Sequence, residues 1–250
     1  MKVVLTTGAN SGLGLATAVE VARRGFRSVG TVRSEEKAKL VNDAALDAGV
    51  DVETVLLDVD DAERCAEVID EIRPWGLINN AGVLDLRRVE DVSDDDARRL
   101  LETLAISPIR LSRLALPHMR AQGGGRIVQV SSISGRTTFP LLGWYQGAKH
   151  ALEGVSDALR MESARDGISI SIVEPGVFDS PMTEHDTPVE WMRPFFASTD
   201  TVARTVVSAL TARVPRARYV VGIDAAINAV TAPVTPTIVR DAVMRMLYGL

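Results

Sequence analysis

Cysteine and histidine are scarce in this 250-residue chain, which also lacks an excess of positive charge. The one cysteine, Cys65, excludes an internal disulfide, and the helical pattern around it predicts that it fills a packing position. The three histidines lie far apart without the spacing of metal ligands, so we predict no metal site. The net charge of −5 excludes the basic surface that nucleic-acid binding needs.

Long apolar runs are missing as well. The first apolar run reaches Gly8 within a few residues, which is too short for a signal peptide, and no stretch has membrane-spanning length. A lone cysteine also fits a reducing compartment. We therefore expect a cytoplasmic protein without stable membrane insertion.

Short apolar segments alternate with helical patterns along the chain. Predicted strands cover residues 3–7, 26–32, 52–57, 77–80, 126–130, 168–173 and 219–222. Predicted helices cover residues 12–24, 34–48, 61–72, 94–122, 143–165 and 199–212, and the longest is interrupted near Pro108 and Pro117. This alternation predicts one α/β domain over residues 1–250, a doubly wound Rossmann-type fold with a mostly parallel seven-stranded sheet and helices on both faces.

A glycine-rich turn joins the first predicted strand to the first predicted helix. Glycines let the backbone approach a pyrophosphate, which the amides and dipole of the helix N-terminus then hold. The spacing is Gly-x-x-x-Gly-x-Gly rather than Gly-x-Gly-x-x-Gly, and a tight turn without a ligand is the alternative. Its place directly after an apolar strand favours a cofactor site formed by Gly8, Asn10, Ser11, Gly12, Leu13 and Gly14.

Tyr145 and Lys149 follow a serine-rich turn and are spaced to share one face of a helix. An ammonium beside a phenol lowers the pKa of the phenol, which could then exchange a proton near neutral pH. Taken alone, Tyr145 could equally be a hydrogen-bonded core tyrosine.

Several motifs in order resemble the short-chain dehydrogenase/reductases. The motifs are the glycine turn, Asn79-Asn80-Ala81-Gly82, the set Ser132, Tyr145 and Lys149, and Pro175-Gly176. The resemblance runs from Lys2 to about Pro181 and continues weakly to the end. The segment from Arg218 to Ala225 loosely resembles the hydroxysteroid and retinol dehydrogenase branch.

The resemblance implies a role for each matching residue. Tyr145 would protonate the substrate carbonyl as hydride leaves nicotinamide, or accept the proton in reverse. Lys149 would lower the pKa of Tyr145 and hold the nicotinamide ribose, and Ser132 would position the substrate oxygen. The further cofactor contacts that it implies are Asp58, Val59, Asn80, Ala81, Gly82, Pro175, Gly176, Val177 and Ser180.

The end of the second predicted strand indicates which cofactor is used. An NAD site usually has a carboxylate there, but Thr31-Val32-Arg33-Ser34 has none. The Arg33 guanidinium suits a 2′-phosphate, and the Ser11 hydroxyl is expected to add a contact. A solvated arginine at a helix start is the alternative. We predict NADP(H).

One position departs from the family. Members often carry an asparagine thirteen residues before the proline that Pro117 matches, and Leu104 stands there instead. The family asparagine opens the helix so that its carbonyl holds a water leading to the lysine. Because Pro108 has no N–H, we expect the Leu104 carbonyl to be free for that water, with Thr103 or Ser107 assisting.

The substrate region is expected around an irregular stretch, residues 177–198, which we predict to be a lid. Its apolar residues and those near 139–144 would border an apolar cleft, although such residues also occur in cores and interfaces. They are Phe139, Leu141, Leu142, Trp144, Met182, Trp191, Met192, Phe195 and Phe196. The tail, residues 225–250, would cover this cleft or pair with a second subunit. The family implies a homodimer or homotetramer through the helices near 94–122 and 143–165.

These features together predict an NADP(H)-dependent oxidoreductase that acts on the carbonyl or alcohol of a mid-sized, mostly apolar substrate. Leu104 keeps an alternative open, a cofactor-binding regulatory protein with weak or no catalysis. An epimerase or dehydratase of the same fold is a third hypothesis, and no residue favours it.

Overall fold

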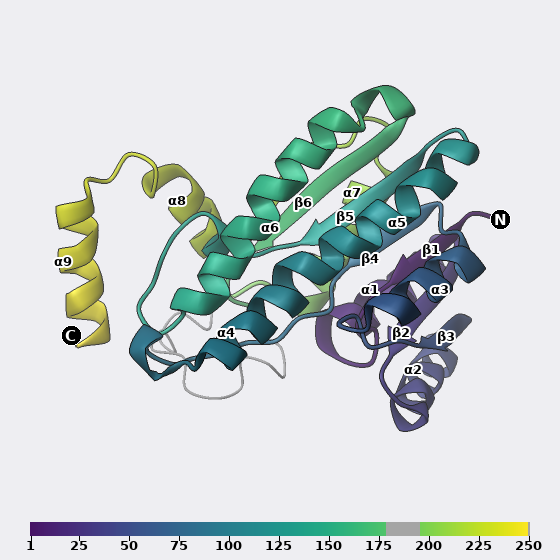
Figure 1. Ribbon diagram of the computed structural model, residues 1–250, viewed down its shortest axis with the longest axis horizontal. Helices are drawn as coiled ribbons and strands as arrows, with labels where there is room; N and C mark the ends of the chain where they lie inside the picture. The colour runs from purple at the N-terminus through teal and green to yellow at the C-terminus, as the bar shows by residue number, and fades with distance from the viewer. Residues whose placement is uncertain (179–195, 250) are drawn as a thin grey trace.

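A seven-stranded parallel sheet forms the centre of the protein, whose computed structural model describes residues 1–178 and 196–249. Its strands are β1 (Val3–Thr6), β2 (Arg27–Val32), β3 (Val52–Leu56), β4 (Gly76–Asn79), β5 (Gly125–Val130), β6 (Ile168–Pro175) and β7 (Arg218–Val221). They lie in the order β3-β2-β1-β4-β5-β6-β7 (Figure 1). The predicted doubly wound fold is confirmed, and every strand pair is parallel.

Helices connect the strands and cover both faces of the sheet (Figure 1). The α-helices are α1 (Gly12–Arg23), α2 (Glu35–Asp47), α3 (Ala62–Ile72), α4 (Asp94–Leu101), α5 (Ser107–Ala121), α6 (Gly143–Glu162), α7 (Thr199–Thr211), α8 (Ile223–Thr231) and α9 (Thr237–Tyr248). The short helical segments are η1 (Val89–Asp91), η2 (Glu102–Ile106), η3 (Ile133–Gly135) and η4 (Ala164–Asp166).

Alternating residues of the strands build a core on each face of the sheet. On β1, Val4 packs with residues of α1 and α7, whereas Leu5 packs with residues of α3 and α5. Leu77 and Ile78 of β4 divide between the same two faces. Side chains of successive strand residues point to opposite faces, so a strand covered on both sides must be apolar throughout. Cys65, fully buried in the α3–α5 core, fills a packing position as predicted.

The longest predicted helix is divided differently from the expectation. The segment η2 between α4 and α5 is π-helical, and the Ser107 amide donates to the Glu102 carbonyl five residues earlier. Pro108 sits in the first turn of α5, where its missing N–H is tolerated. The predicted interruption near Pro117 is wrong, because α5 continues through it to Ala121.

The order of the strands creates a crevice at one edge of the sheet. The chain builds β1, β2 and β3 in one direction and then crosses to β4 on the other side of β1. Ligands of open parallel sheets bind at the carboxyl ends of the strands where this reversal occurs. The glycine turn follows β1 there, and Asn80 follows β4.

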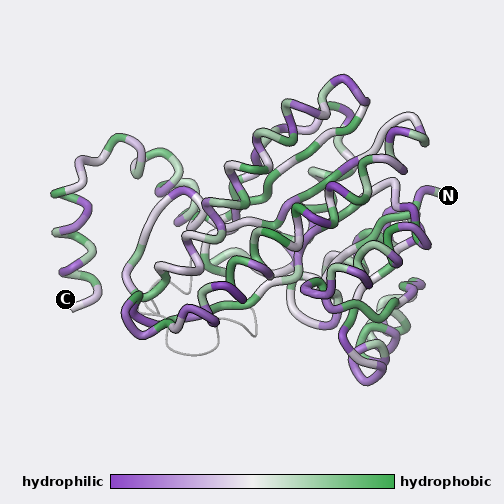
Figure 2. Tube along the Cα trace, viewed as in Figure 1, coloured by the Kyte–Doolittle hydropathy of each residue, from purple (hydrophilic) through white to green (hydrophobic). Residues whose placement is uncertain are grey.

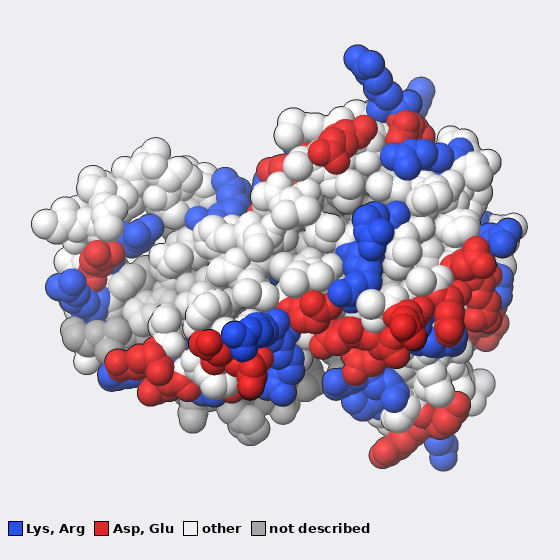
Figure 3. Space-filling model, viewed as in Figure 1, with Lys and Arg blue, Asp and Glu red and all other residues white. Residues whose placement is uncertain are grey.

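The predicted tail forms α8 and α9, which extend from the body of the molecule (Figure 1). No residue of α9 is buried, although Ile238 and Met246 are among several large apolar side chains on it. Apolar and polar residues alternate along this helix (Figure 2). In the part of the chain that the structure describes, no helix is both long and apolar enough to span a membrane. The visible face carries acidic and basic side chains interspersed, with no continuous basic surface (Figure 3).

Candidate active site

A cavity of about 440 Å³ opens at the carboxyl ends of β1 and β4 and joins both predicted halves of the site. Its lining includes most of the predicted cofactor residues: Gly8, Asn10, Ser11, Gly12, Leu13, Gly14, Arg33, Asp58, Val59, Asn80, Ala81, Gly82, Tyr145, Lys149 and Pro175. Ser132 lies beside this lining, which its neighbour Ser131 enters. Ser180 lies outside the described residues.

Close backbone packing explains the glycines of the turn. A Cβ on Gly14 would lie 2.0 Å from the Gly8 carbonyl oxygen, and one on Gly8 would lie 2.9 Å from the Cα of Ala81. Gly8 also has a φ of 66°, in the left-handed region that favours glycine. The turn is thus held against the segment after β4, and larger residues would separate them.

The N-terminus of α1 is left open toward the cavity. At α2, α3, α4 and α7 the residue before the helix accepts a hydrogen bond from an amide of the first turn. Ser11, in the same position of α1, makes no such bond, and Ser11 to Gly14 line the cavity. Free amides at a helix N-terminus bind phosphate, so this end of the cavity fits a pyrophosphate.

Arg33 lies just past the end of β2, on the rim of the same cavity. Its side chain is exposed and forms no salt bridge with the described residues. The two residues after Arg33, Ser34 and Glu35, begin α2. Asp58, beyond β3, is also exposed and accepts a hydrogen bond from the Asp60 amide at 3.2 Å.

Thr7 and Asn80 connect the two loops that frame the cavity. The Thr7 hydroxyl accepts hydrogen bonds from the amides of Asn80 at 2.9 Å and Ala81 at 3.0 Å. The Asn80 side chain donates to the carbonyls of Thr7 at 3.0 Å and Gly8 at 3.3 Å. Asn80 is therefore a structural part of the phosphate end, and the sequence pattern did not single out Thr7.

Asn79 has a different task from its neighbour. It is buried, and its amide donates to the Pro108 carbonyl at 3.0 Å, to Ser112 at 3.1 Å and to Gln129 at 2.9 Å. These bonds fix α5 against β4 and β5 just beyond the π-helical segment.

Tyr145 and Lys149 lie at the other end of the cavity, one turn apart on α6. Burial raises the pKa of Tyr145 to about 12, and the neighbouring Ser132 hydroxyl opposes this rise. The direction is opposite to the expected lowering by Lys149, because burial removes the phenolate from water. The Ser132 hydroxyl also accepts from the Ser134 amide at 3.1 Å, which begins η3.

The Lys149 ammonium is held by the backbone of β5. Its Nζ donates to the Val130 carbonyl at 2.8 Å and lies 5.9 Å from the centre of the Tyr145 ring. Burial lowers the pKa of Lys149 to about 8, and the charge of Glu153 opposes this lowering. The ammonium therefore begins to lose its proton slightly above neutral pH.

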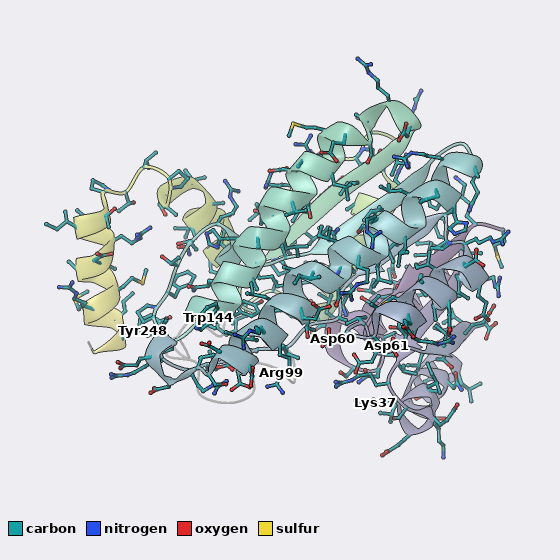
Figure 4. All side chains as sticks on the ribbon, viewed as in Figure 1. Lys37, Asp60, Asp61, Arg99, Trp144 and Tyr248 are labelled. Atoms are coloured by element: carbon teal, nitrogen blue, oxygen red, sulfur yellow. The ribbon has the colours of Figure 1, made fainter. Side chains whose placement is uncertain are left out.

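Leu104 packs beside the tyrosine, in the centre of the π-helical segment. It forms a small apolar cluster with Leu100 and Ala148, against which Tyr145 and Trp144 pack. The helix is π-helical here without an asparagine, and the free Leu104 carbonyl expected from Pro108 stays a prediction. The hydroxyls of Thr103 and Ser107 donate to Asp60, which Figure 4 labels, at 2.7 and 3.2 Å. Each hydroxyl keeps lone pairs that can accept from a water, so the expected assistance stays a prediction.

The loop after β6 is held from outside by α8. The Asp224 carboxylate accepts from the Val177 amide at 2.8 Å. A Cβ on Gly176 would lie 2.1 Å from an oxygen of the same carboxylate. Gly176 and Val177 border the site without lining the cavity, and sequence reasoning gave Asp224 no role.

The expected apolar cleft is only partly described. Phe178 lines the main cavity and pairs with Ala197, so the two ends of the predicted lid meet. Residues 179–195, with Met182, Trp191, Met192 and Phe195, lie outside the described residues. Trp144 packs in the Leu104 cluster. Phe139 faces α9 across a second cavity of about 390 Å³, lined also by Arg240, Asp241 and Arg245.

Other residues of the main cavity were not predicted. They include Thr31 in β2, Val83 and Asp85 after β4, and Arg99 and Leu100 on α4. Neither periodicity nor motif marks them. Among the described residues, no group of three or more His, Cys, Asp and Glu side chains is placed to hold a metal ion.

Comparison with known proteins agrees with this geometry. The family model described as short chain dehydrogenase matches residues 2–191. The chain is 37% identical over 183 residues to the uncharacterized oxidoreductase YusZ of Bacillus subtilis, covering 71% of this chain and 65% of that protein. It is 36% identical over 200 residues to human 17-beta-hydroxysteroid dehydrogenase type 6, covering 77% of this chain and 62% of that protein. These matches thus span just under two thirds of each relative.

A solved structure extends the similarity over nearly the whole chain. The short-chain dehydrogenase from Streptomyces avermitilis superposes with a TM-score of 0.82 at 29% identity, covering 99% of this chain and 95% of that one. The sheet order, the glycine turn and the matched residues lead to one conclusion. The chain belongs to the short-chain dehydrogenase/reductase family.

Proposed function

We propose that the protein is an NADP(H)-dependent oxidoreductase that transfers hydride between nicotinamide and the carbonyl or alcohol carbon of a small molecule. One observation carries the proposal: a single cavity joins the open N-terminus of α1 and Arg33 to Tyr145 and Lys149. A phosphate-binding end and a proton-transfer end then open into the same cavity.

Each residue has a defined task in this reaction. The bound nicotinamide supplies or accepts the hydride. The Tyr145 hydroxyl donates a proton to the substrate oxygen in reduction, and its high pKa keeps it protonated at neutral pH. The Ser132 hydroxyl, next to Tyr145, holds the same oxygen. The Lys149 ammonium stabilises the phenolate that forms and binds the nicotinamide ribose.

The preference for NADP(H) rests on Arg33. A free guanidinium at the end of β2 favours a 2′-phosphate by charge and by its paired donors. The amides of α1 hold the pyrophosphate, Asp58 and Val59 border the adenine, and Pro175 to Val177 border the nicotinamide, with Ser180 as the further contact.

The substrate is proposed to be mid-sized and mostly apolar. Leu100, Leu104 and Phe178 line the cavity near Tyr145, and one relative is named for a steroid. Leu104 presents methyl groups where an amide is usual, which removes a hydrogen-bonding group from this wall.

Leu104 also favours the second candidate, a cofactor-binding regulatory protein with weak or no catalysis. A water held by a helix carbonyl near Lys149 would keep the proton path intact. The π-helical segment η2, whose hydrogen bonds are displaced from the α-helical pattern, supports such a path. This segment is the reason to prefer the enzyme over the regulatory protein.

Oxidation of NADPH in the presence of aliphatic, aromatic and steroid carbonyls tests the proposal. Turnover with at least one class is expected, with NADH supporting it less well. Tight NADPH binding with no turnover on any class would instead support the regulatory protein. Light scattering on the same sample tests the proposed homodimer or homotetramer.

A further inference from the structure

A buried ionic cluster lies behind the proton-transfer end of the cavity. It joins Glu153 of α6, Glu174 of β6 and Arg218 of β7. The Arg218 guanidinium lies 2.9 Å from a Glu153 oxygen and 2.8 Å from a Glu174 oxygen. The two glutamate side chains are 6% and 0% exposed, and carboxylates this deep are costly unless they are paired.

Glu153 continues the face of α6 that carries the reacting residues. It follows Lys149 by four residues, just as Lys149 follows Tyr145. Residues four apart are neighbours on a helix, and Lys149 and Glu153 are both buried. The buried face of α6 thus carries two charged residues, whereas Val155 on the same helix is exposed.

Glu153 also contacts the serine turn. A Cβ on Gly135 would lie 2.9 Å from the Cγ of Glu153 and 2.8 Å from the Ser131 hydroxyl. The three groups therefore converge where η3 meets α6. Burial raises the pKa of Glu153, and the Ser131 hydroxyl opposes this rise. Ser131 precedes Ser132, so one carboxylate supports both Lys149 and the substrate-positioning serine.

Other charges around Glu153 belong to the same cluster. Arg218 also binds Asp157 of α6 at 2.7 Å, and Arg136, beyond η3, lies 3.2 Å from Glu174. Glu174 raises the pKa of Glu153 and Arg218 lowers it. The Arg218 guanidinium thus pairs with both buried carboxylates.

We propose that Glu153, clamped by Arg218, is a positioning residue that keeps Lys149 charged and fixes the Ser131–Ser132 turn beside it. The proposal rests on the role of Lys149 in the proposed function, but it concerns the charge of Lys149 in the free protein. The proposal also gives a function to Arg218. In the sequence, its segment was noted only because it resembles the hydroxysteroid and retinol dehydrogenase branch.

The small number of lysines makes a direct test possible. The chain has only Lys2, Lys37, Lys39 and Lys149, so a protein labelled with ¹³C at lysine Cε gives few signals, and Lys149→Arg identifies that of Lys149. In Glu153→Gln we expect the titration midpoint of Lys149 to fall by about 1, since a close opposite charge is worth at least that much. Asp157→Asn is the matched control, because Asp157 also binds Arg218 but lies a turn farther from Lys149. Its midpoint should equal that of the wild type.

A second variant covers the case in which Glu153→Gln does not fold. Glu153→Asp keeps the charge and withdraws it by one methylene, so a smaller fall in the midpoint is expected. An unchanged midpoint in a folded Glu153 variant would overturn the proposal. An equally large fall in the Lys149 midpoint in Asp157→Asn would also overturn the proposal, since any negative charge on α6 would then keep Lys149 charged.

Activity gives an independent readout if the proposed reaction is correct. The basic limb of the pH profile of kcat/KM should move to lower pH in Glu153→Gln, with little change on the acidic side. General destabilisation of the fold would lower the activity without moving the basic limb of the pH profile. Absence of turnover in the wild type would count against the proposed function and leave the NMR result intact.

Discussion

The ammonium of Lys149 lies 5.9 Å from the centre of the Tyr145 ring and is held there by the Val130 carbonyl. In this arrangement burial sets both pKa values, raising that of the tyrosine to about 12 and lowering that of the lysine to about 8. At neutral pH the phenol is protonated and can donate its proton to a carbonyl oxygen, while the neighbouring amine still carries most of its charge.

The buried Lys149 should make stability depend on pH. Its folded pKa of about 8 lies below the ordinary 10.5, so between these values the unfolded chain binds more protons. The free energy of unfolding therefore rises with pH across this window. From about pH 7.5 to about pH 10, the wild type should gain on the order of 1–3 kcal/mol relative to Lys149→Met. Urea unfolding measures this gain, and a pH-independent difference would show that Lys149 titrates normally.

Arg33→Ala should weaken NADPH binding by about 10- to 100-fold, because charged hydrogen bonds to the 2′-phosphate are lost. NADH has no such phosphate, so its affinity should stay within about threefold of the wild type. Arg98→Ala is a suitable control, since Arg98 is exposed on α4 and does not line the cavity. Calorimetric titration with both cofactors measures the effect. Equal losses for NADPH and NADH would remove the basis for the cofactor preference.

Two glycines should respond oppositely to alanine. The Cβ of Gly14→Ala would lie 2.0 Å from a backbone oxygen, so we expect loss of NADPH binding and a lower melting temperature. Gly147, between Tyr145 and Lys149, has no neighbour within 4 Å of an added Cβ. Gly147→Ala should stabilise the protein by about 0.5–1 kcal/mol, as alanine does within a helix. Thermal unfolding of both variants tests this, and similar effects would contradict the packing described for the turn.

The fold and most of the cofactor end were predictable because they depend on local patterns. The apolar strand before Gly8 and the helix after it define the turn, and the parallel order of strands then brings Asn80 beside it. Every strand end lies within two residues of the prediction, because glycine, proline and polar residues mark where the apolar runs stop.

The supporting residues were not predictable, since they depend on contacts between distant segments. Glu153 reads as a solvated helix residue until β7 brings Arg218 to it. Asp224 has a function only because α8 lies against the Val177 amide. The pKa of Tyr145 was wrongly expected to be low, since a sequence shows the neighbouring lysine but not the depth of burial.

Asp224 and Gly176 should be energetically coupled. Gly176→Ala places a Cβ 2.1 Å from the Asp224 carboxylate, so it should displace the loop and weaken NADPH binding at least about tenfold. Adding Asp224→Ala removes the obstruction and should recover part of the loss, so the two effects are not additive. Additive changes in the dissociation constant would show that the carboxylate does not hold this loop.

Replacement of Tyr145 by phenylalanine tests the central claim most directly. The variant removes one hydroxyl oxygen and leaves the Gly8–Gly14 turn and Arg33 untouched. With a carbonyl substrate that the wild type reduces, kcat should fall by about 10²- to 10⁴-fold, the usual contribution of a positioned acid. The dissociation constant for NADPH should stay within about threefold of the wild type. A variant that keeps its kcat within about tenfold of the wild type, with NADPH binding intact, would show that Tyr145 is not the proton donor.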